Sequence, residues 1–314
     1  MSGRTMIFDN AFRTILERAP ELVVMMINEA FHTDYRFDEP VIQCRNEHVT
    51  KAGKIVTDSV LVVRGVSYHV EVQAYSDSGM QIRMIEYDFH IALGNAEQKD
   101  GVYRIRFPES CVFFIRRQRL KNKTLDVEIE FPDGAKVMYK AKAIPTLSYT
   151  LDDIFEKKLY ALIPYYLLKY EKKKDILEGS DKDRDELLRD YKEIADRLIR
   201  IMEDDPTAGY ISVLLDLVND VADEVLAGQP ETRKGLGEIM GGQVMTLASD
   251  RMAAEAEARG EIRGGNNMLY KLVQDGKLSI EDAAKEMGVT RKKFLDQMTL
   301  CGYKAPDEKS SENE

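Results

Sequence analysis

Hydrophobic and polar positions follow two different periods in the first half of the chain. Between residues 6 and 31 the apolar residues recur at helical spacing, which predicts a helix that Pro20 breaks or kinks. Runs rich in β-branched residues follow at 57–63 and 68–75, and the short polar turn between them contains a glycine. Two such runs around a tight turn predict an antiparallel β-hairpin.

The same two periods alternate through the rest of the first half. Helical spacing returns over 80–98, and the apolar run at 111–115 is typical of a buried strand. Strand patterns at 125–131 and 136–144 flank a Pro-Asp-Gly turn, which predicts a second hairpin. We therefore expect a mixed α/β fold in which helices flank a mixed sheet.

After Ser148 the strand patterns stop, and we expect an all-helical second half. The segment 151–171 has an acidic first turn and a long apolar run, which predicts one helix with a kink at Pro164. Charged residues of both signs fill 171–190, which indicates a solvated helix face or a connector. Helical patterns continue over 191–203 and 207–227. A glycine-rich stretch at 235–242 is expected to loosen the chain, and an Ala/Glu-rich helix is expected over 243–262.

These changes in pattern divide the chain into four expected parts. The mixed α/β core occupies residues 1–150, and a helical extension occupies 151–262. After a hinge at Arg263-Gly264-Gly265, a small helix-turn-helix-like unit is expected over 266–304, and residues 305–314 are expected to form a disordered tail.

The composition excludes several classes of protein. Of the 314 residues 44% are hydrophobic, which is enough to bury a core and excludes wholesale disorder. Charged residues interrupt every apolar run before about 18 residues, and the first residues lack the apolar segment of a secretory signal. We therefore expect no membrane span and no secretion. Three scattered cysteines, Cys44, Cys111 and Cys301, fit a reducing cytoplasm better than a disulfide framework.

The net charge of −10 argues against nucleic acid only when the chain is taken as a whole. Residues 1–150 carry 20 Lys and Arg against 20 Asp and Glu, so this half is neutral. Residues 151–314 carry 25 against 35, which accounts for the entire excess of acid. The first half therefore remains a candidate for contact with DNA.

The first hairpin carries the residues best suited to chemistry. Residues two apart on a strand share a face, so His69, Glu71 and Gln73 are expected to point one way while the valines between them point into a core. Asp58 opens the preceding strand, and paired strands lie about 4.8 Å apart, so its carboxylate and that of Glu71 can converge on one Mg²⁺. Such an ion neutralises a scissile phosphate and activates water, and Gln73 can orient either group.

A plainer interpretation of these residues stays open. Asp58 can cap a turn, while Glu71 and Gln73 can lie on the solvated face of a half-buried sheet. An Asp followed by Glu-x-Gln at this spacing is not specific, because the pattern recurs in many β-rich chains. The four histidines show no zinc-site spacing and are expected to be structural.

Four motifs follow one another along the chain: Asp9-Asn10-Ala11-Phe12-Arg13, TDSVLVV (57–63), YHVEVQ (68–73) and a helix containing Arg83 and Tyr87. In this order they resemble the recombination-promoting nuclease family, whose members are also called PD-(D/E)XK nuclease family transposases. The Asp-x-x-Phe-Arg pattern is similar to the family's opening Asp-x-x-Phe-Lys motif. The run 159–171 is similar to the family's helix after the nuclease core, and the resemblance covers about residues 5–170.

The resemblance implies a restriction-endonuclease-like core that cleaves DNA with bound Mg²⁺ or Mn²⁺. It implies that Asp58 and Glu71 bind the metal and that Gln73 stands where the wider superfamily has a catalytic lysine, which leaves the source of positive charge open. Asp9 matches the acidic position in the family's first helix and is expected to add an outer metal contact. As a residue near a helix start, Asp9 is equally suited to be a helix N-cap.

Basic residues in the first half are candidates for DNA contacts. Arg83 and Tyr87 are expected on one helix face, where Arg83 would touch a phosphate or pair with a carboxylate. The segment 104–123 holds seven basic residues and one acidic residue. Within it Arg116 and Arg117 would track a DNA backbone or lie at a solvated strand end.

The last unit has its own pattern. A capping box at Ser279, a glycine turn and a threonine cap predict two short helices. They resemble a helix-turn-helix whose second helix would present Arg291, Lys292 and Lys293 to DNA. The same helices would equally suit self-association into a homo-oligomer.

Together these features favour a Mg²⁺-dependent DNA endonuclease linked to recombination or mobile elements. The alternative, from a different class, is a catalytically silent DNA-binding or assembly protein that keeps the same fold. It predicts salt-sensitive DNA binding without turnover. A metabolic α/β enzyme is disfavoured because the sequence has neither a Gly-rich phosphate loop nor a nucleophile elbow.

Overall fold

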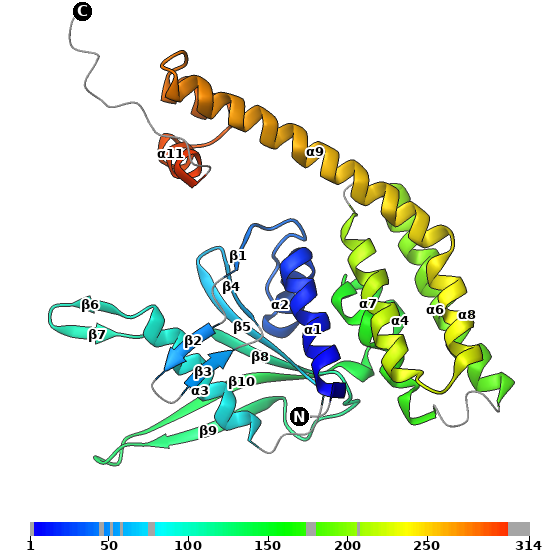
Figure 1. Ribbon diagram of the computed structural model, residues 1–314. Coiled ribbons are helices and arrows are strands. Elements are labelled where there is room, and N and C mark those ends of the chain that lie inside the picture. Colours follow the sequence, from blue (N-terminus) through cyan, green and yellow to red (C-terminus); the bar gives the residue numbers. More distant parts are fainter. Residues whose placement is uncertain are drawn as a thin grey trace, which may run out of the picture. The chain divides into compact units, whose positions relative to one another are not determined.

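A computed structural model of the protein describes residues 3–43, 47–50, 53–56, 59–74, 79–173, 180–205 and 208–300 (Figure 1). The chain forms two compact units, residues 1–249 and 250–314, and each is described by itself. The fold is mixed α/β, with a six-stranded mixed sheet in the first half and, in the described residues after Pro145, helices alone. The expected fold class is confirmed at this level.

The sheet of the first unit combines two hairpins that lie on either side of a central strand. Its strands, in order across the sheet, are β1 (Val41–Gln43), β4 (Ser59–Val63), β5 (Val66–Gln73), β8 (Glu109–Phe114), β10 (Lys136–Pro145) and β9 (Thr124–Glu130). β4–β5 and β9–β10 are the two predicted antiparallel hairpins. β8 runs parallel to both β5 and β10, so the carboxyl ends of these three strands lie at one edge.

The turn of the β4–β5 hairpin contains only two residues. Val63 pairs with Val66, and both Arg64 and Gly65 have positive φ angles, of 47° and 81°. Two left-handed residues in succession make the turn type whose twist matches the twist of paired strands. Arg64 is further held by two hydrogen bonds, of 3.0 and 2.7 Å, that it donates to the Glu39 carboxylate. The register of β5 is therefore set close to the turn.

Helices cover both faces of the sheet. α1 (Gly3–Arg18) and α2 (Glu21–Phe31), which Pro20 separates as predicted, pack against the face that bears Cys111 and Phe113 of β8. α3 (Met80–Gly94) packs against the other face, which bears Val112 and Phe114. Because successive residues of a strand point to opposite faces, β8 is buried on both sides. Its continuous apolar run reflects this double burial.

Two short hairpins were not predicted from the pattern. They are β2 (Glu47–Thr50) with β3 (Gly53–Val56), and β6 (Glu97–Lys99) with β7 (Val102–Arg104). The second hairpin takes the last residues of the segment predicted as helix over 80–98. α3 ends at Gly94, where Asn95 donates its backbone N–H to the carbonyls of Ala92 and Leu93.

The segment 151–171 is not one kinked helix, as the sequence predicted. It forms α4 (Leu151–Glu156), a turn at Lys158 with a φ of 53°, and the 3₁₀ helix η2 (Tyr160–Lys169). Pro164 lies inside η2 and has no N–H to donate to a carbonyl one turn back, so a regular α-helix loses a hydrogen bond there. The burial of nine residues of η2 stabilises the tighter helix instead.

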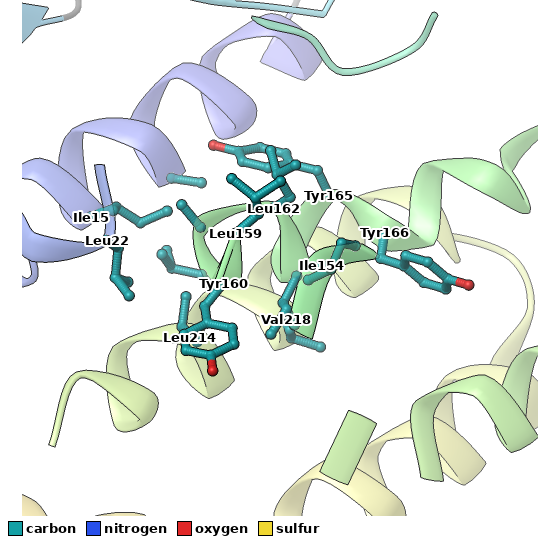
Figure 2. Packing of buried hydrophobic residues seen from close by; sticks show 14 of the residues in the cluster. Ile15, Leu22, Ile154, Leu159, Tyr160, Leu162, Tyr165, Tyr166, Leu214 and Val218 are labelled. Carbon is teal, nitrogen blue, oxygen red and sulfur yellow. The ribbon is translucent and has the colours of Figure 1, made fainter. Parts of the chain in front are cut away.

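η2 lies at the centre of the main core (Figure 2). Its side chains pack against Ile15 of α1, Leu22 of α2, and Leu214 and Val218 of α7 (Tyr210–Val225). The hydroxyl of Tyr165 donates a 3.0 Å hydrogen bond to the Phe8 carbonyl. The apolar run after the sheet therefore joins the first helices to the later ones in one core.

The remaining helices described in the first unit are the 3₁₀ helices η1 (Thr146–Ser148) and η3 (Glu171–Lys173), then α6 (Asp181–Asp204), α8 (Pro230–Gly241) and the start of α9 (Gln243–Gln274). α9 continues through Gly264 and Gly265. The glycine-rich stretch that we expected to loosen the chain is instead the regular helix α8. Gly235 faces α6, where a Cβ atom would lie 3.1 Å from Leu188 Cδ1. The glycine thus permits close helix packing.

In the second unit α9 is followed by two short helices, α10 (Ile280–Glu286) and α11 (Arg291–Leu300). Ser279 caps α10 as predicted, and the turn passes through Gly288 at a φ of 64°. Tyr270 of α9 and Phe294 of α11 pack with their ring centroids 5.1 Å apart. Among the helices that the structure describes, none has the length and apolar character needed to cross a membrane.

Candidate functional site

The side chains of His69, Glu71 and Gln73 share the face of β5 that α3 covers. The alternation predicted for this strand is confirmed, since Val70 and Val72 lie in the core on the opposite face. Glu71 is only 3% exposed and His69 is fully buried. The alternative interpretation, that Glu71 lies on a solvated sheet face, is therefore wrong, because α3 covers that face.

His69 lies between two carboxylates. Its Nδ1 is 2.6 Å from Asp88 Oδ1, and its Nε2 is 2.9 Å from Glu71 Oε1. Burial lowers the pKa of His69, but the hydrogen bonds to Asp88 and Glu71 outweigh it and raise the pKa to about 9. Since both partners are acceptors, both ring nitrogens donate, and His69 is an imidazolium at neutral pH.

Asp88 is anchored from two further strands. Its Oδ2 accepts hydrogen bonds of 2.5 Å from Ser110 Oγ of β8 and 2.6 Å from the Tyr139 hydroxyl of β10. Burial, followed by the charge of Asp88, raises the pKa of Tyr139, so the hydroxyl keeps its proton and donates. Asp88 itself is fully buried on α3. A continuous polar chain therefore runs from β10 and β8 through α3 to Glu71.

The carboxylate of Asp9 also lies within electrostatic reach of Glu71. Burial and then the negative charge of Glu71 raise the pKa of Asp9, against the opposite effect of Arg13 and Arg83. Asp9 lies inside α1, six residues after its first residue Gly3, so its interpretation as a helix N-cap is wrong. It belongs instead to the electrostatic environment of Glu71.

Arg83 of α3 lies beside the Glu-x-Gln motif. Its Nη2 lies 3.5 Å from Gln73 Oε1, and its guanidinium carbon lies 5.9 Å from the centroid of the Tyr87 ring. The predicted common face of Arg83 and Tyr87 is thus confirmed. Arg83 places a permanent positive charge beside Gln73.

The oxygen donors around Glu71 are of the kind that a hard divalent cation prefers. Asp9 and Glu71 supply carboxylate oxygens and Gln73 supplies an amide oxygen. A bound cation would relieve the repulsion between the two carboxylates. No three His, Cys, Asp or Glu side chains are grouped as a metal site within the described residues. Asp58, the other expected ligand, lies outside those residues.

Arg116 and Arg117 occupy different environments although they are neighbours. Arg116 donates two 2.7 Å hydrogen bonds to the Glu171 carboxylate, and its guanidinium carbon lies 4.6 Å from the centroid of the Phe8 ring. Arg116 thus ties the end of β8 to the helices, whereas the side chain of Arg117 is exposed at the surface.

The loop after β8 forms one wall of a cavity of about 530 Å³. Arg119 and Lys123 of the loop and Lys142 of β10 line it, and all three are exposed. Glu29, the acidic residue of this lining, accepts hydrogen bonds from Lys157 and from the Tyr149 hydroxyl. The cavity therefore presents mainly positive charge. The sequence did not predict this cavity, although the basic segment 104–123 indicates its positive charge.

In the second unit Arg291, Lys292 and Lys293 are exposed at the start of α11. Arg291 Nε donates a 2.8 Å hydrogen bond to Glu281 of α10. The predicted presentation of basic residues is thus observed, with one of the three engaged by an acidic neighbour. DNA binding by this unit stays a prediction.

Sequence reasoning missed His69 and Asp88 as parts of the site. Asp88 lies on the buried face of α3 together with Met84 and Ile91, four residues before it and three after it. A carboxylate in the apolar stripe of a helix requires a buried partner, so this position is a readable signal. His69, two residues before Glu71 and between two apolar positions of β5, is the matching signal.

No family model, no curated protein and no solved structure matches the chain. The family resemblance therefore rests on the motifs of the chain itself and stays a prediction.

Proposed function

We propose that the chain is a divalent-metal-dependent DNA endonuclease with a restriction-endonuclease-like core, of the recombination-promoting nuclease type. The observation that carries this proposal is the Glu71 carboxylate, which is buried and held at 2.9 Å by His69 Nε2. Asp9 and the Gln73–Arg83 pair surround it. The pKa of Asp9 is raised by burial and by the charge of Glu71, and a perturbed carboxylate among other charged groups marks a candidate functional site.

The path of the chain supports this proposal. The hairpin β4–β5, the helix α3 and the parallel strand β8 follow one another, with α1 and α2 ahead of them. This order fits the mixed sheet flanked by helices that the family resemblance implies. It also explains how Arg83 on α3 comes to lie beside Gln73 at the end of β5.

Each residue of the site would have a separate role in phosphodiester hydrolysis. Glu71, Asp58 and Asp9 would hold Mg²⁺ or Mn²⁺, which when bound neutralises a scissile phosphate and acidifies a water. The Gln73 amide can accept from that water or donate to a phosphate oxygen. Arg83 offsets negative charge on the phosphate and supplies the positive charge that a lysine supplies elsewhere in the superfamily.

The basic cavity supports DNA as the substrate. Arg119, Lys123 and Lys142 are exposed cations that line this cavity, and Pro145, the last residue of β10, lines it as well. Gln73 ends β5 at the same edge of the sheet as Pro145, since both residues pair with Phe114 of β8. Lys142 pairs with Cys111 and so lies on the sheet face that α1 and α2 cover, opposite the face of Gln73. A DNA backbone would therefore pass around this edge of the sheet to contact both.

A catalytically silent DNA-binding protein is the second candidate, and the burial of Glu71 favours it. Glu71 is 3% exposed and one of its oxygens is bonded to His69. A purely structural carboxylate would be satisfied in the same way. The two candidates differ in turnover, because only the nuclease converts DNA and only the nuclease requires Mg²⁺.

A plasmid-nicking assay tests the proposal. Full-length protein should convert supercoiled plasmid to nicked or linear DNA with Mg²⁺ and not with EDTA. Glu71→Gln and Asp58→Asn should each lower the rate roughly 100-fold or more, because each removes a charged metal ligand. Glu109→Gln, an exposed residue on β8, is the matched control and should cleave at the wild-type rate. Cleavage that survives both carboxylate substitutions would overturn the assignment.

A further inference from the structure

One polar chain crosses four elements on the α3 side of the sheet. It begins at Ser110 and Tyr139, continues through Asp88 and His69, and ends at Glu71. Each of its four hydrogen bonds is between 2.5 and 2.9 Å. The donor and acceptor of each hydrogen bond follow from the side-chain types, since hydroxyl and imidazolium donors alternate with carboxylate acceptors.

The polar chain of hydrogen-bonded side chains fixes the orientation of Glu71 relative to the sheet. His69 and Glu71 are two residues apart on β5, so their side chains leave the strand in the same direction. Asp88 holds His69 from the far side, and two strands hold Asp88. The Glu71 carboxylate is thereby fixed through side chains that are themselves locked.

The polar chain also satisfies hydrogen-bonding groups where water is excluded. Asp88 and His69 are fully buried, and Glu71 nearly so. A buried carboxylate without a hydrogen-bond donor would be very unfavourable, because it loses its hydration. Asp88 accepts from Ser110 and Tyr139, and His69 lies within hydrogen-bonding distance of both carboxylates.

We propose, on the basis of the proposed nuclease function, that His69 is a positioning residue for Glu71. It contacts neither the DNA nor the cation. It fixes the Glu71 carboxylate in one orientation, in which this group is presented to a divalent cation. Partners that orient a metal ligand in this way commonly change metal affinity 10- to 100-fold.

A role in stability alone does not explain the arrangement. The neighbours of the chain on this face include the apolar residues Met84 and Val112, and apolar residues of similar volume commonly replace buried ionic groups without loss of stability. What an apolar residue cannot supply is a donor aimed at Glu71 Oε1. A comparison of His69→Gln with His69→Leu therefore distinguishes a role in stability from a role in orienting Glu71, because only glutamine keeps an N–H donor.

Mn²⁺ binding to the full-length, metal-free protein tests the proposal independently of cleavage. Titration calorimetry should show an affinity for Mn²⁺ that falls about 10-fold in His69→Gln and further in His69→Leu. The kcat of plasmid cleavage should fall in the same order while the KM for DNA stays constant. His90→Gln, a partly exposed histidine of α3, is the matched control and should bind Mn²⁺ as the wild type does.

Tyr139→Phe provides a milder second variant that removes one hydroxyl from Asp88 and keeps the ring. It should weaken Mn²⁺ binding in the same direction by a smaller factor, with the thermal midpoint nearly unchanged. Folded His69→Leu or Tyr139→Phe protein that binds Mn²⁺ as tightly as the wild type would overturn the role of His69 alone. Wild-type protein that binds no Mn²⁺ would overturn the proposed function and, with it, this role.

Discussion

At the scale of single residues, the charge of His69 sets the properties of its neighbours. One proton on each ring nitrogen connects Asp88 and Glu71, so a single cation serves two buried carboxylates. Loss of that proton would leave two anions facing a neutral ring. The protonation of His69 is therefore linked to folding as well as to the state of Glu71.

This linkage predicts a pH dependence of stability. The pKa of His69 is about 9 in the folded protein, above its ordinary value of 6.5, so the folded state holds the proton more tightly than the unfolded state. The stabilisation is complete below pH 6.5 and is lost as the pH rises to about 9. In metal-free protein the unfolding free energy should fall by about 1 kcal/mol per pH unit in this window. Urea unfolding from pH 6 to 10 measures it, and His69→Gln should flatten this part of the curve.

Arg116 and Arg117 provide a second prediction at this scale. Arg116→Ala should lower the unfolding free energy by about 1–3 kcal/mol, because it leaves Glu171 without its charged partner and removes contact with Phe8. Arg117→Ala should lower stability less than Arg116→Ala does, because Arg117 is exposed, and it should weaken DNA binding. Urea unfolding and fluorescence anisotropy with a labelled duplex distinguish the two. Equal effects of both substitutions on stability would contradict the assignment.

Some of these residue-level features follow from the sequence and others do not. The period of two in β5 predicts that Glu71 and Gln73 share a face, because that pattern is local. The partners of Asp88 lie 19, 22 and 51 residues away in the chain. No local pattern reports such separations, and the network becomes visible only when the sheet brings the strands together.

At the scale of elements, the hairpin β4–β5 depends on the conformation of its turn. Gly65 has a φ of 81° and open space where a Cβ would lie. Gly65→Ala should lower the unfolding free energy by about 1 kcal/mol through backbone strain alone. Gly94→Ala, at the end of α3 and also in open space, is the matched control and should be neutral or stabilising. Thermal unfolding of both variants measures the difference.

Element types were predictable where a pattern is local and strong. Both hairpins of the sheet, the break at Pro20 and the caps of the last helices are set by turn and capping residues that act on their neighbours. The conformations of η2 and α8 were not predictable, because the burial of their residues in the tertiary structure determines them. The sequence of η2 fits an α-helix until its packing around Pro164 is known, and Gly235 disfavours a helix until Leu188 packs against it.

At the scale of the whole molecule, the net charge of −10 does not describe the surface that would meet DNA. Arg119, Lys123 and Lys142 gather around one cavity in the neutral half. Lys142→Ala should reduce the slope of log Kd for DNA against log salt by about 1, since each phosphate contact contributes about 0.9. Lys136→Ala, on the same strand but paired with Glu128 and Glu130, should leave the slope unchanged. Equal slopes for Lys142→Ala and wild type would place the DNA elsewhere.

The central claim is that Glu71 belongs to a metal site that cleaves DNA. The most direct measurement is the rate of plasmid cleavage at increasing Mg²⁺ for the wild type, Glu71→Gln and Glu109→Gln. The account predicts cleavage that saturates with Mg²⁺ in the wild type and in Glu109→Gln, and a rate lower by roughly 100-fold or more in Glu71→Gln. Equal cleavage by all three proteins, or none by folded wild type at any Mg²⁺ concentration, would contradict it.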